Sequence, residues 1–120
     1  MAVVASIFIY PEKDQPGQEL DSVGVSEAGL DGDRRKKSPV HLVTATEFVT
    51  SHPRANLVLD MADEALADLV GRRLRIGDVE LEVTSLAGDC PGVYAVVPVP
   101  GEVSVDDLVT VETHESAAGR

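Results

Sequence analysis

A glycine-rich and strongly charged segment, residues 29–37, holds the side chains best suited to binding an anion. Its four consecutive cations are Arg34, Arg35, Lys36 and Lys37. Gly29 and Gly32 permit a positive φ and let a ligand approach the main chain closely, and arginine can bind a phosphate through two parallel hydrogen bonds. A run of like charges is also typical of a solvated loop, and Asp31 and Asp33 would neutralise part of this one. The residues alone leave both interpretations open.

Cys90 is the only cysteine of the chain, and it stands in the turn-forming sequence Gly88-Asp89-Cys90-Pro91-Gly92. A single cysteine excludes an intramolecular disulfide and any metal or iron–sulfur centre built from several cysteines. Free cysteines are usually inert core residues, whereas a loop cysteine becomes a nucleophile or a metal ligand when nearby cations lower its pKa. An inert and a reactive Cys90 are both compatible with the sequence at this point.

Arg54 and Asn56 stand just after Pro53, where an apolar segment begins. Side chains of these two types can fork onto a phosphate or onto the edge of a pterin-like ring. Alternatively, Arg54 is a surface arginine and Asn56 a turn residue. A third group of cations, Arg72, Arg73 and Arg75, resembles a basic patch, but the hairpin described below gives Arg73 and Arg75 carboxylate partners.

Several other kinds of site are excluded. The three histidines, His41, His52 and His114, lack the spacing of a protein zinc site, and His41 is expected inside a strand as a partly buried imidazole. No Ser-His-Asp arrangement, P-loop or GxGxxG sequence is present. A nucleotide-hydrolysing enzyme and a dinucleotide-dependent enzyme therefore have no support.

Composition excludes further classes of partner. Twenty-one acidic residues against ten Lys and Arg give a net charge of −11, which opposes attraction to nucleic acid or to an anionic membrane. Aromatic residues make up 3%, too few for a base-stacking surface. No apolar run approaches the roughly 20 residues of a membrane span, and residues 3–10 lack the preceding cations of an export signal. We expect no nucleic-acid or membrane partner and a cytoplasmic location with a reduced thiol.

The candidate residues must be positioned by a small, mostly β domain. The chain has 120 residues, 43% of them hydrophobic, which suits one domain with a core of Val, Leu, Ile and Ala. Strand-like segments are expected at residues 3–9, 20–26, 40–43, 56–60, 72–76, 79–84, 93–99 and 108–111. Helical patterns are limited to a start at Thr44-Ala45-Thr46-Glu47 and to residues 62–70, with Gly71 as a C-cap. Many short strands with one or two short helices indicate a β-barrel or a sandwich. We expect one domain over residues 1–115 and a flexible tail over 116–120.

The clearest local pattern is a β-hairpin around Gly77-Asp78, a pair suited to a type II′ turn. The predicted register pairs Ile76 with Val79, Leu74 with Leu81, Arg75 with Glu80 and Arg73 with Glu82. Opposite charges directly across a ladder contribute about 0.2–1 kcal/mol each.

Several motifs, taken in order, resemble the MOSC family, named for the C-terminal domain of molybdenum cofactor sulfurases. They are Gly29-Leu30-Asp31-Gly32-Asp33-Arg34, Arg54-Ala55-Asn56-Leu57-Val58, residues 69–79, and Leu81-Glu82-Val83-Thr84 leading to Cys90. The resemblance covers about residues 23–112. It implies a small MOSC-type β-barrel with one or two short helices.

The resemblance also implies roles for particular residues. Cys90 takes the place of the family's sulfur carrier or molybdenum ligand. Arg34 takes the place of the arginine in the GDR motif, and Arg54 and Asn56 that of the RxN element, which hold the phosphate and pterin of the molybdenum cofactor. Arg35 stands where many members have histidine and is a further cofactor-binding candidate. Lys36 matches nothing fixed in the family pattern and is added to the candidates on charge alone. Asp106-Asp107 replaces an expected Gly-Asp pair, and aspartate tolerates a positive φ better than most residues.

Three functions follow as hypotheses. The first is a protein that binds the molybdenum cofactor (molybdopterin), or carries sulfur without pyridoxal phosphate, through Cys90, with a sulfur-donor protein as partner. The second is a molybdenum-dependent reductase of N-hydroxylated compounds, which needs a separate reductase as electron donor. The third is a non-catalytic binding module with a degenerate site. For the first, barrel closure should bring Cys90 into a cleft beside residues 29–37 and Arg54 or Asn56.

Overall fold

The structure, a computed structural model, describes residues 2–12, 15–34, 39–51, 53–61, 66–87 and 91–112. Strands dominate this part of the chain, as the sequence predicts. In chain order the elements are β1 (Ala2–Ile9), β2 (Gln18–Leu20), β3 (Ser22–Ser26), β4 (Gly29–Leu30), β5 (Val40–Thr44), α1 (Ala45–Ser51), β6 (Leu57–Asp60), the 3₁₀ helix η1 (Leu66–Leu69), β7 (Arg73–Ile76), β8 (Val79–Leu86), β9 (Val93–Val99), β10 (Gly101–Ser104) and β11 (Leu108–Val111).

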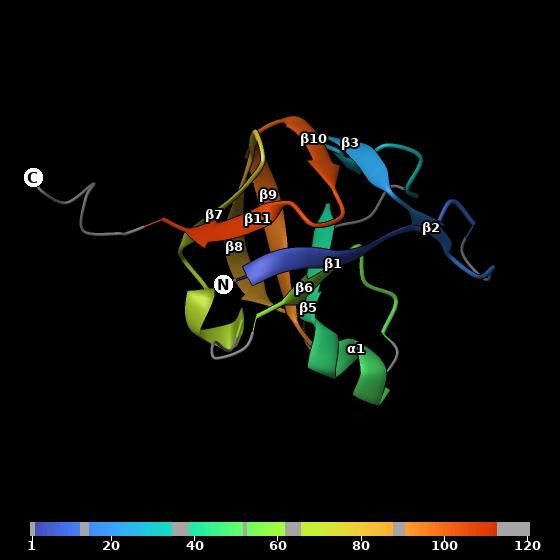
Figure 1. Cartoon of the computed structure of the whole chain (residues 1–120), viewed down its shortest axis with the longest axis horizontal. Coiled ribbons are helices and arrows are strands. Elements are labelled where there is room, and N and C mark those ends of the chain that lie inside the picture. Colours follow the sequence, from blue (N-terminus) through green and yellow to red (C-terminus); the bar gives the residue numbers. More distant parts are fainter. Residues whose placement is uncertain are drawn as a thin grey trace, which may run out of the picture.

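Seven strands close into a barrel in the order β11-β7-β8-β9-β5-β6-β1 (Figure 1). Closure comes from the antiparallel pairing of β1 with β11, where Ala2 lies opposite Val109. β5 and β6 pair in parallel, and α1 lies between them in the sequence. β2 extends the sheet beside the far end of β1, and β10, β3 and β4 form a second, three-stranded sheet. The predicted mostly β, barrel-type fold is confirmed.

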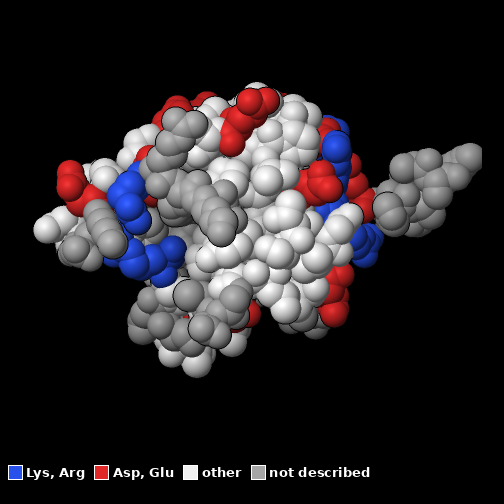
Figure 2. Space-filling model, turned by 180° about the vertical axis from the view of Figure 1, so that it is seen from behind, with Lys and Arg blue, Asp and Glu red and all other residues white. Residues whose placement is uncertain are grey.

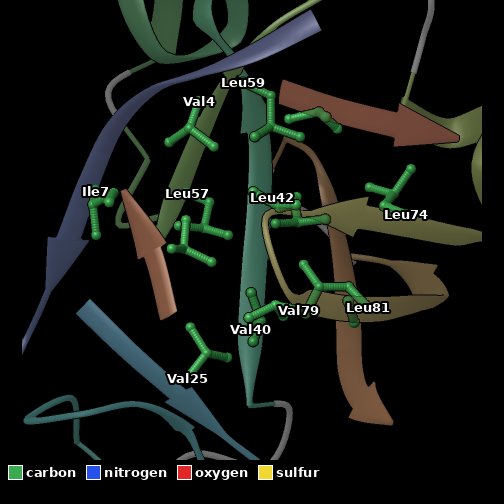
Figure 3. Packing of buried hydrophobic residues seen from close by; sticks show 14 of the residues in the cluster. Val4, Ile7, Val25, Val40, Leu42, Leu57, Leu59, Leu74, Val79 and Leu81 are labelled. Atoms are coloured by element: carbon green, nitrogen blue, oxygen red, sulfur yellow. The ribbon is translucent and has the colours of Figure 1, made fainter. Parts of the chain in front are cut away.

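The interior of the barrel is aliphatic (Figure 3). Ile7, Leu42, Leu57, Leu74 and Leu81 are fully buried in it. The second sheet adds residues to the same core: Val23, Val25, Leu30 and Val103. Leu, Val, Ile and Ala, with one methionine, make up the buried cluster of the described residues. The predicted composition of the core is therefore confirmed.

A smaller cluster lies on the outer surface of the barrel, beneath α1. Its buried members are Val43, Ala55 and Val58, packed against Phe8 and Phe48. Val43 in β5 and Val58 in β6 alternate along their strands with residues that point into the barrel, so these two face outward. Thr44 and Glu47 begin α1 as a capping box, since each side chain accepts the other's backbone N–H. The predicted helix start is confirmed.

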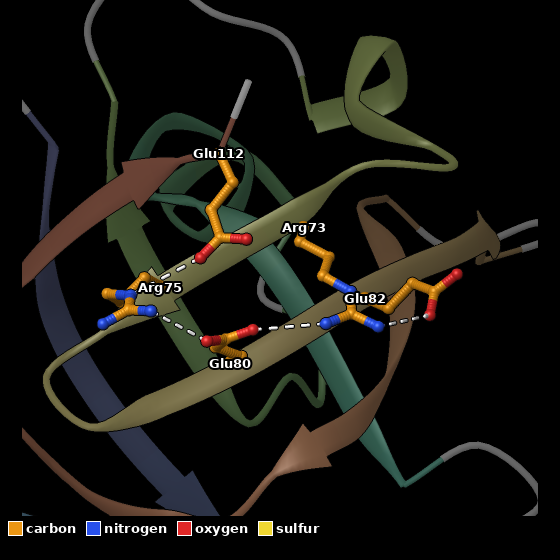
Figure 4. A network of polar contacts seen from close by, with 5 residues as sticks. All are labelled: Arg73, Arg75, Glu80, Glu82 and Glu112. Carbon is orange, nitrogen blue, oxygen red and sulfur yellow. Dashed lines mark hydrogen bonds and ion pairs between the residues drawn. The ribbon is translucent and has the colours of Figure 1, made fainter. Parts of the chain in front are cut away.

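The hairpin of β7 and β8 has the predicted register in every pair. Gly77 has a φ of 58°, and the φ of Asp78 is not positive. A positive φ followed by a negative one is the sign pattern of a type II′ turn. On the outer face, Arg75 lies 2.8 Å from Glu80 and Arg73 lies 3.3 Å from it (Figure 4). Such exposed pairs stabilise a fold only slightly. They do show that these two arginines are engaged within the hairpin.

Most predicted strands agree with the structure to within one or two residues at their ends, and the larger differences concern the following segments. Residues 20–26 divide into the end of β2 and all of β3. The segment predicted as a loop from residue 29 begins with the two-residue strand β4, and a further strand, β10, follows directly after Pro100. Both strands contain a glycine, which the sequence pattern associates with a turn. Antiparallel pairing with β3 nevertheless makes these segments strands. In the segment predicted as helical over residues 62–70, only η1 is described.

Asp106 occupies the position where the family pattern has glycine, and its φ is 77°. It is the one non-glycine residue with a positive φ in the described ranges. Its backbone N–H donates to Val4 at 2.8 Å, so the turn between β10 and β11 is fixed against β1. Aspartate tolerates this conformation better than most residues.

Replacing Asp106 with glycine should therefore stabilise the protein. A non-glycine residue in this conformation costs about 1–2 kcal/mol, whereas glycine loses about 0.4–1 kcal/mol through the entropy of the unfolded chain. We expect a net gain of about 0.5 kcal/mol in the free energy of unfolding in urea. Asp78→Gly is the matched control, because Asp78 is also an exposed turn aspartate but has no positive φ to relieve. It should lose stability, and a loss in both variants would contradict this account.

None of the helices in the described ranges has the length and apolar character needed to cross a membrane.

Candidate functional site

Asn56, which directly precedes β6, connects three parts of the fold through its side chain. It is completely buried. Its Oδ1 accepts the backbone N–H of His41 in β5 at 3.0 Å. Its Nδ2 donates to the carbonyl oxygen of Phe8 in β1 at 3.3 Å and to Oδ2 of Asp33 at 3.1 Å. One amide therefore joins the loop after β4 to two barrel strands.

The loop after β4 is also attached to the end of β1. Oδ1 of Asp33 accepts the backbone N–H of Tyr10 at 2.7 Å. The backbone N–H of Arg34 donates to the carbonyl oxygen of Tyr10 at 3.2 Å. Gly29 and Gly32 have φ values of 113° and 84°, as the sequence predicts for this glycine-rich segment. Asp33 and Arg34 thus bind both polar groups of the Tyr10 backbone.

Arg54 contacts the side chain of Tyr10. Its guanidinium carbon is 4.4 Å from the centre of the Tyr10 ring, within the range of a cation–π contact. It also donates to the carbonyl oxygens of Gln15 at 2.9 Å and Glu12 at 3.3 Å. Burial raises the pKa of the Tyr10 phenol, Arg54 lowers it, and the carboxylate of Asp33 raises it. The Tyr10 phenol is therefore influenced by one charged side chain from each of two motifs, Arg54 and Asp33.

His41 extends this network to the segment that follows Cys90. Its Nε2 lies 2.8 Å from the carbonyl oxygen of Pro91, and because a carbonyl can only accept, Nε2 carries the hydrogen. The ring also meets the edge of Tyr94, with centroids 5.3 Å apart. His41 is 6% exposed within β5, which confirms the expected imidazole in a strand.

The structure brings together some of the residues singled out in the sequence. Arg34 and Arg54 both lie at Tyr10, Asn56 lies beneath Asp33, and Pro91 is held by His41. Four other candidates, Cys90, Arg35, Lys36 and Lys37, lie outside the described residues. The position of the Cys90 thiol in a cleft stays a prediction.

The charges near Tyr10 differ from those on the hairpin. Arg34 and Arg54 are exposed, and within the described ranges neither side chain forms an ion pair with a carboxylate. Arg73 and Arg75, by contrast, are each paired with Glu80. Figure 2 shows the described arginines in two groups at opposite ends of one face. Of the exposed arginines in the described ranges, Arg34 and Arg54 are thus the two whose charge is not paired with a carboxylate.

Sequence reasoning missed the part played by Tyr10 and by the side chain of His41. One indication was present, since Tyr10 is one of only four Phe, Tyr and Trp residues and directly follows a predicted strand. Asp33 was considered only as a neutralising charge, although it stands inside the GDR sequence. No group of three His, Cys, Asp or Glu in the described part of the chain is arranged to hold a metal ion.

Comparison with known proteins places this fold among solved barrels. The sequence matches no protein-family model and no curated protein. YuaD from Bacillus subtilis is similar in structure, with a TM-score of 0.72 and 16% identity, over 95% of this chain and 97% of that one. YiiM from Escherichia coli has a TM-score of 0.68 and 14% identity, over 93% and 70% of the two chains. A hypothetical protein has a TM-score of 0.76 and 15% identity, over 95% and 70%. At these identities the likeness shows a common fold.

Proposed function

We propose that this protein is a MOSC-type protein that binds the molybdenum cofactor or carries sulfur on Cys90. One observation carries the proposal: Asp33-Arg34, Arg54-Ala55-Asn56 and Pro91 meet through one hydrogen-bonded network, although they are far apart in the sequence. These are the segments in which the MOSC resemblance places its site residues. The barrel shared with YuaD and YiiM is consistent with that resemblance.

The residues at Tyr10 fit the phosphate end of such a cofactor. Arg34 is exposed and free of ion pairs to described carboxylates, and a guanidinium binds a phosphate in a bidentate manner. Arg54 adds a second positive charge, held with its guanidinium carbon 4.4 Å from the centre of the Tyr10 ring. The cofactor, when bound, would supply a metal centre that a soft thiolate ligand suits.

For sulfur transfer, the same cations would favour the thiolate form of Cys90, which is the nucleophilic form. The thiolate would attack the outer sulfur of a persulfide on a donor protein. A new sulfur–sulfur bond forms at Cys90, the donor's sulfur–sulfur bond breaks, and the donor leaves as a thiolate. The proton on the transferred sulfur stays with it, so the step is balanced and needs no external oxidant.

Purified protein tests the proposal directly. The chain should be produced in a bacterial host with intact cofactor synthesis and analysed for molybdenum and pterin. In parallel, the mass of the chain should be measured after incubation with a small persulfide. We expect either bound cofactor or the mass increase of one sulfur atom, with the latter lost in Cys90→Ser. Bound molybdenum together with reduction of an N-hydroxylated compound by an added reductase would favour the reductase alternative.

The matched variants are Arg34→Gln and Arg73→Gln, because both remove one exposed arginine from the same protein. Only Arg34→Gln should reduce cofactor retention, since Arg73 is paired with Glu80 on the hairpin. Protein with neither cofactor nor transferred sulfur would contradict the proposal and leave the non-catalytic binding module.

A further inference from the structure

We infer that Asp33 and Asn56 are positioning residues: they hold Arg34 in place for an anion and do not contact the anion themselves. This inference rests on the proposed function of the basic site. It changes the expected role of Asn56, which the family resemblance places among the cofactor-binding residues. The reason is the environment of its side chain.

The amide of Asn56 is fully engaged inside the protein. Oδ1 accepts from His41, and Nδ2 donates to Phe8 and Asp33. With no exposed surface, the amide cannot reach a ligand outside the barrel. A buried amide without partners costs about 1–3 kcal/mol, so these hydrogen bonds fix its orientation strongly. Asn56 therefore presents one N–H at a defined place beneath the loop.

Asp33 transmits that position to Arg34. Its two carboxylate oxygens have different donors, Nδ2 of Asn56 and the backbone N–H of Tyr10. Both bonds involve a charged acceptor and are stronger than neutral ones. The next residue, Arg34, is then fixed by its own backbone N–H on Tyr10. The loop is thus held at two consecutive residues while the Arg34 side chain stays exposed.

The sign of a mutational effect separates positioning from simple electrostatics. Asp31 and Asp33 lie two residues apart in the same loop, but only the side chain of Asp33 bonds to Asn56. Each of Asp31→Asn and Asp33→Asn removes one negative charge near Arg34. Charge alone would strengthen anion binding in both variants. Positioning predicts weaker binding in Asp33→Asn, because asparagine has one acceptor oxygen where Asp33 uses two. Its new amide N–H₂ would therefore face either Nδ2 of Asn56 or the backbone N–H of Tyr10.

Reversing the pair should restore the contact. In the double variant Asn56→Asp with Asp33→Asn, residue 33 can still accept from Tyr10 and can now donate to residue 56. Residue 56 can still accept from His41. The bond to Phe8 is lost, so we expect partial recovery. If Asp33 and Asn56 contributed only to the stability of the fold, adding Asn56→Asp to Asp33→Asn would not restore anion binding.

The experiment is calorimetric titration of the full chain with inorganic phosphate, with stability followed by urea unfolding. We expect Asp33→Asn to bind phosphate about tenfold more weakly, Asp31→Asn to bind at least as well as the wild type, and the double variant to recover part of the loss. If Asn56→Asp or the double variant fails to fold, the comparison of Asp33→Asn with Asp31→Asn decides.

Equal effects of Asp31→Asn and Asp33→Asn would overturn the inference. Arg34→Gln separates this failure from failure of the proposed site. If Arg34→Gln weakens phosphate binding while Asp33→Asn does not, the basic site stands and the positioning role is wrong. If Arg34→Gln leaves phosphate binding unchanged, both the proposed site and the inference are wrong.

Discussion

Replacing Gly92 with alanine is expected to destabilise the barrel by at least about 3 kcal/mol. Gly92 has a φ of 91°, which costs an alanine about 1–2 kcal/mol. A Cβ at this position would also overlap the carbonyl oxygen of Leu42 and lie 2.7 Å from Cγ1 of Val43. Because the Cβ would overlap backbone atoms of β5, it could be accommodated only if the start of β9 moved away from β5. Urea unfolding followed by circular dichroism measures the loss.

Gly71 provides the matched control for this prediction. Its φ is 90°, nearly the same as that of Gly92, but a Cβ there meets no atom within 4 Å. Gly71→Ala should therefore cost only the conformational term of about 1–2 kcal/mol. The difference between the two variants isolates the close approach of β9 to β5. Equal losses would contradict the close packing that also places Pro91 against His41.

Local features of the fold were predictable from the sequence because short-range patterns determine them. The β7–β8 hairpin follows from one turn pair and an alternating pattern on either side, and its register is confirmed in every pair. The positive φ of Asp106 is compatible with the observation that aspartate tolerates this conformation better than most residues. Barrel class follows from many short strands with few helices.

The site was only partly predictable, because its contacts join residues far apart in the chain. Arg34, Arg54 and Asn56 were identified by type and motif order. Nothing local indicates that Asn56 is buried, since the side-chain partners described above come from β1, β5 and the loop after β4. Tyr10 was missed for the same reason, as its partners lie 23 and more residues away. Strands such as β10 become strands only through pairing with β3.

The central claim, that Arg34 and Cys90 belong to one site, is tested most directly by two alkylating reagents. Iodoacetate is negatively charged and iodoacetamide is neutral, and the chain has a single cysteine, so the ratio of their rates reports the local potential at Cys90. The measured quantity is the rate with iodoacetate divided by the rate with iodoacetamide. We expect this ratio to be about tenfold lower in Arg34→Gln than in the wild type, and unchanged in Arg73→Gln. In the wild type it should also fall with added salt. A ratio that Arg34→Gln leaves unchanged would show that Cys90 lies apart from the basic site and would contradict the account.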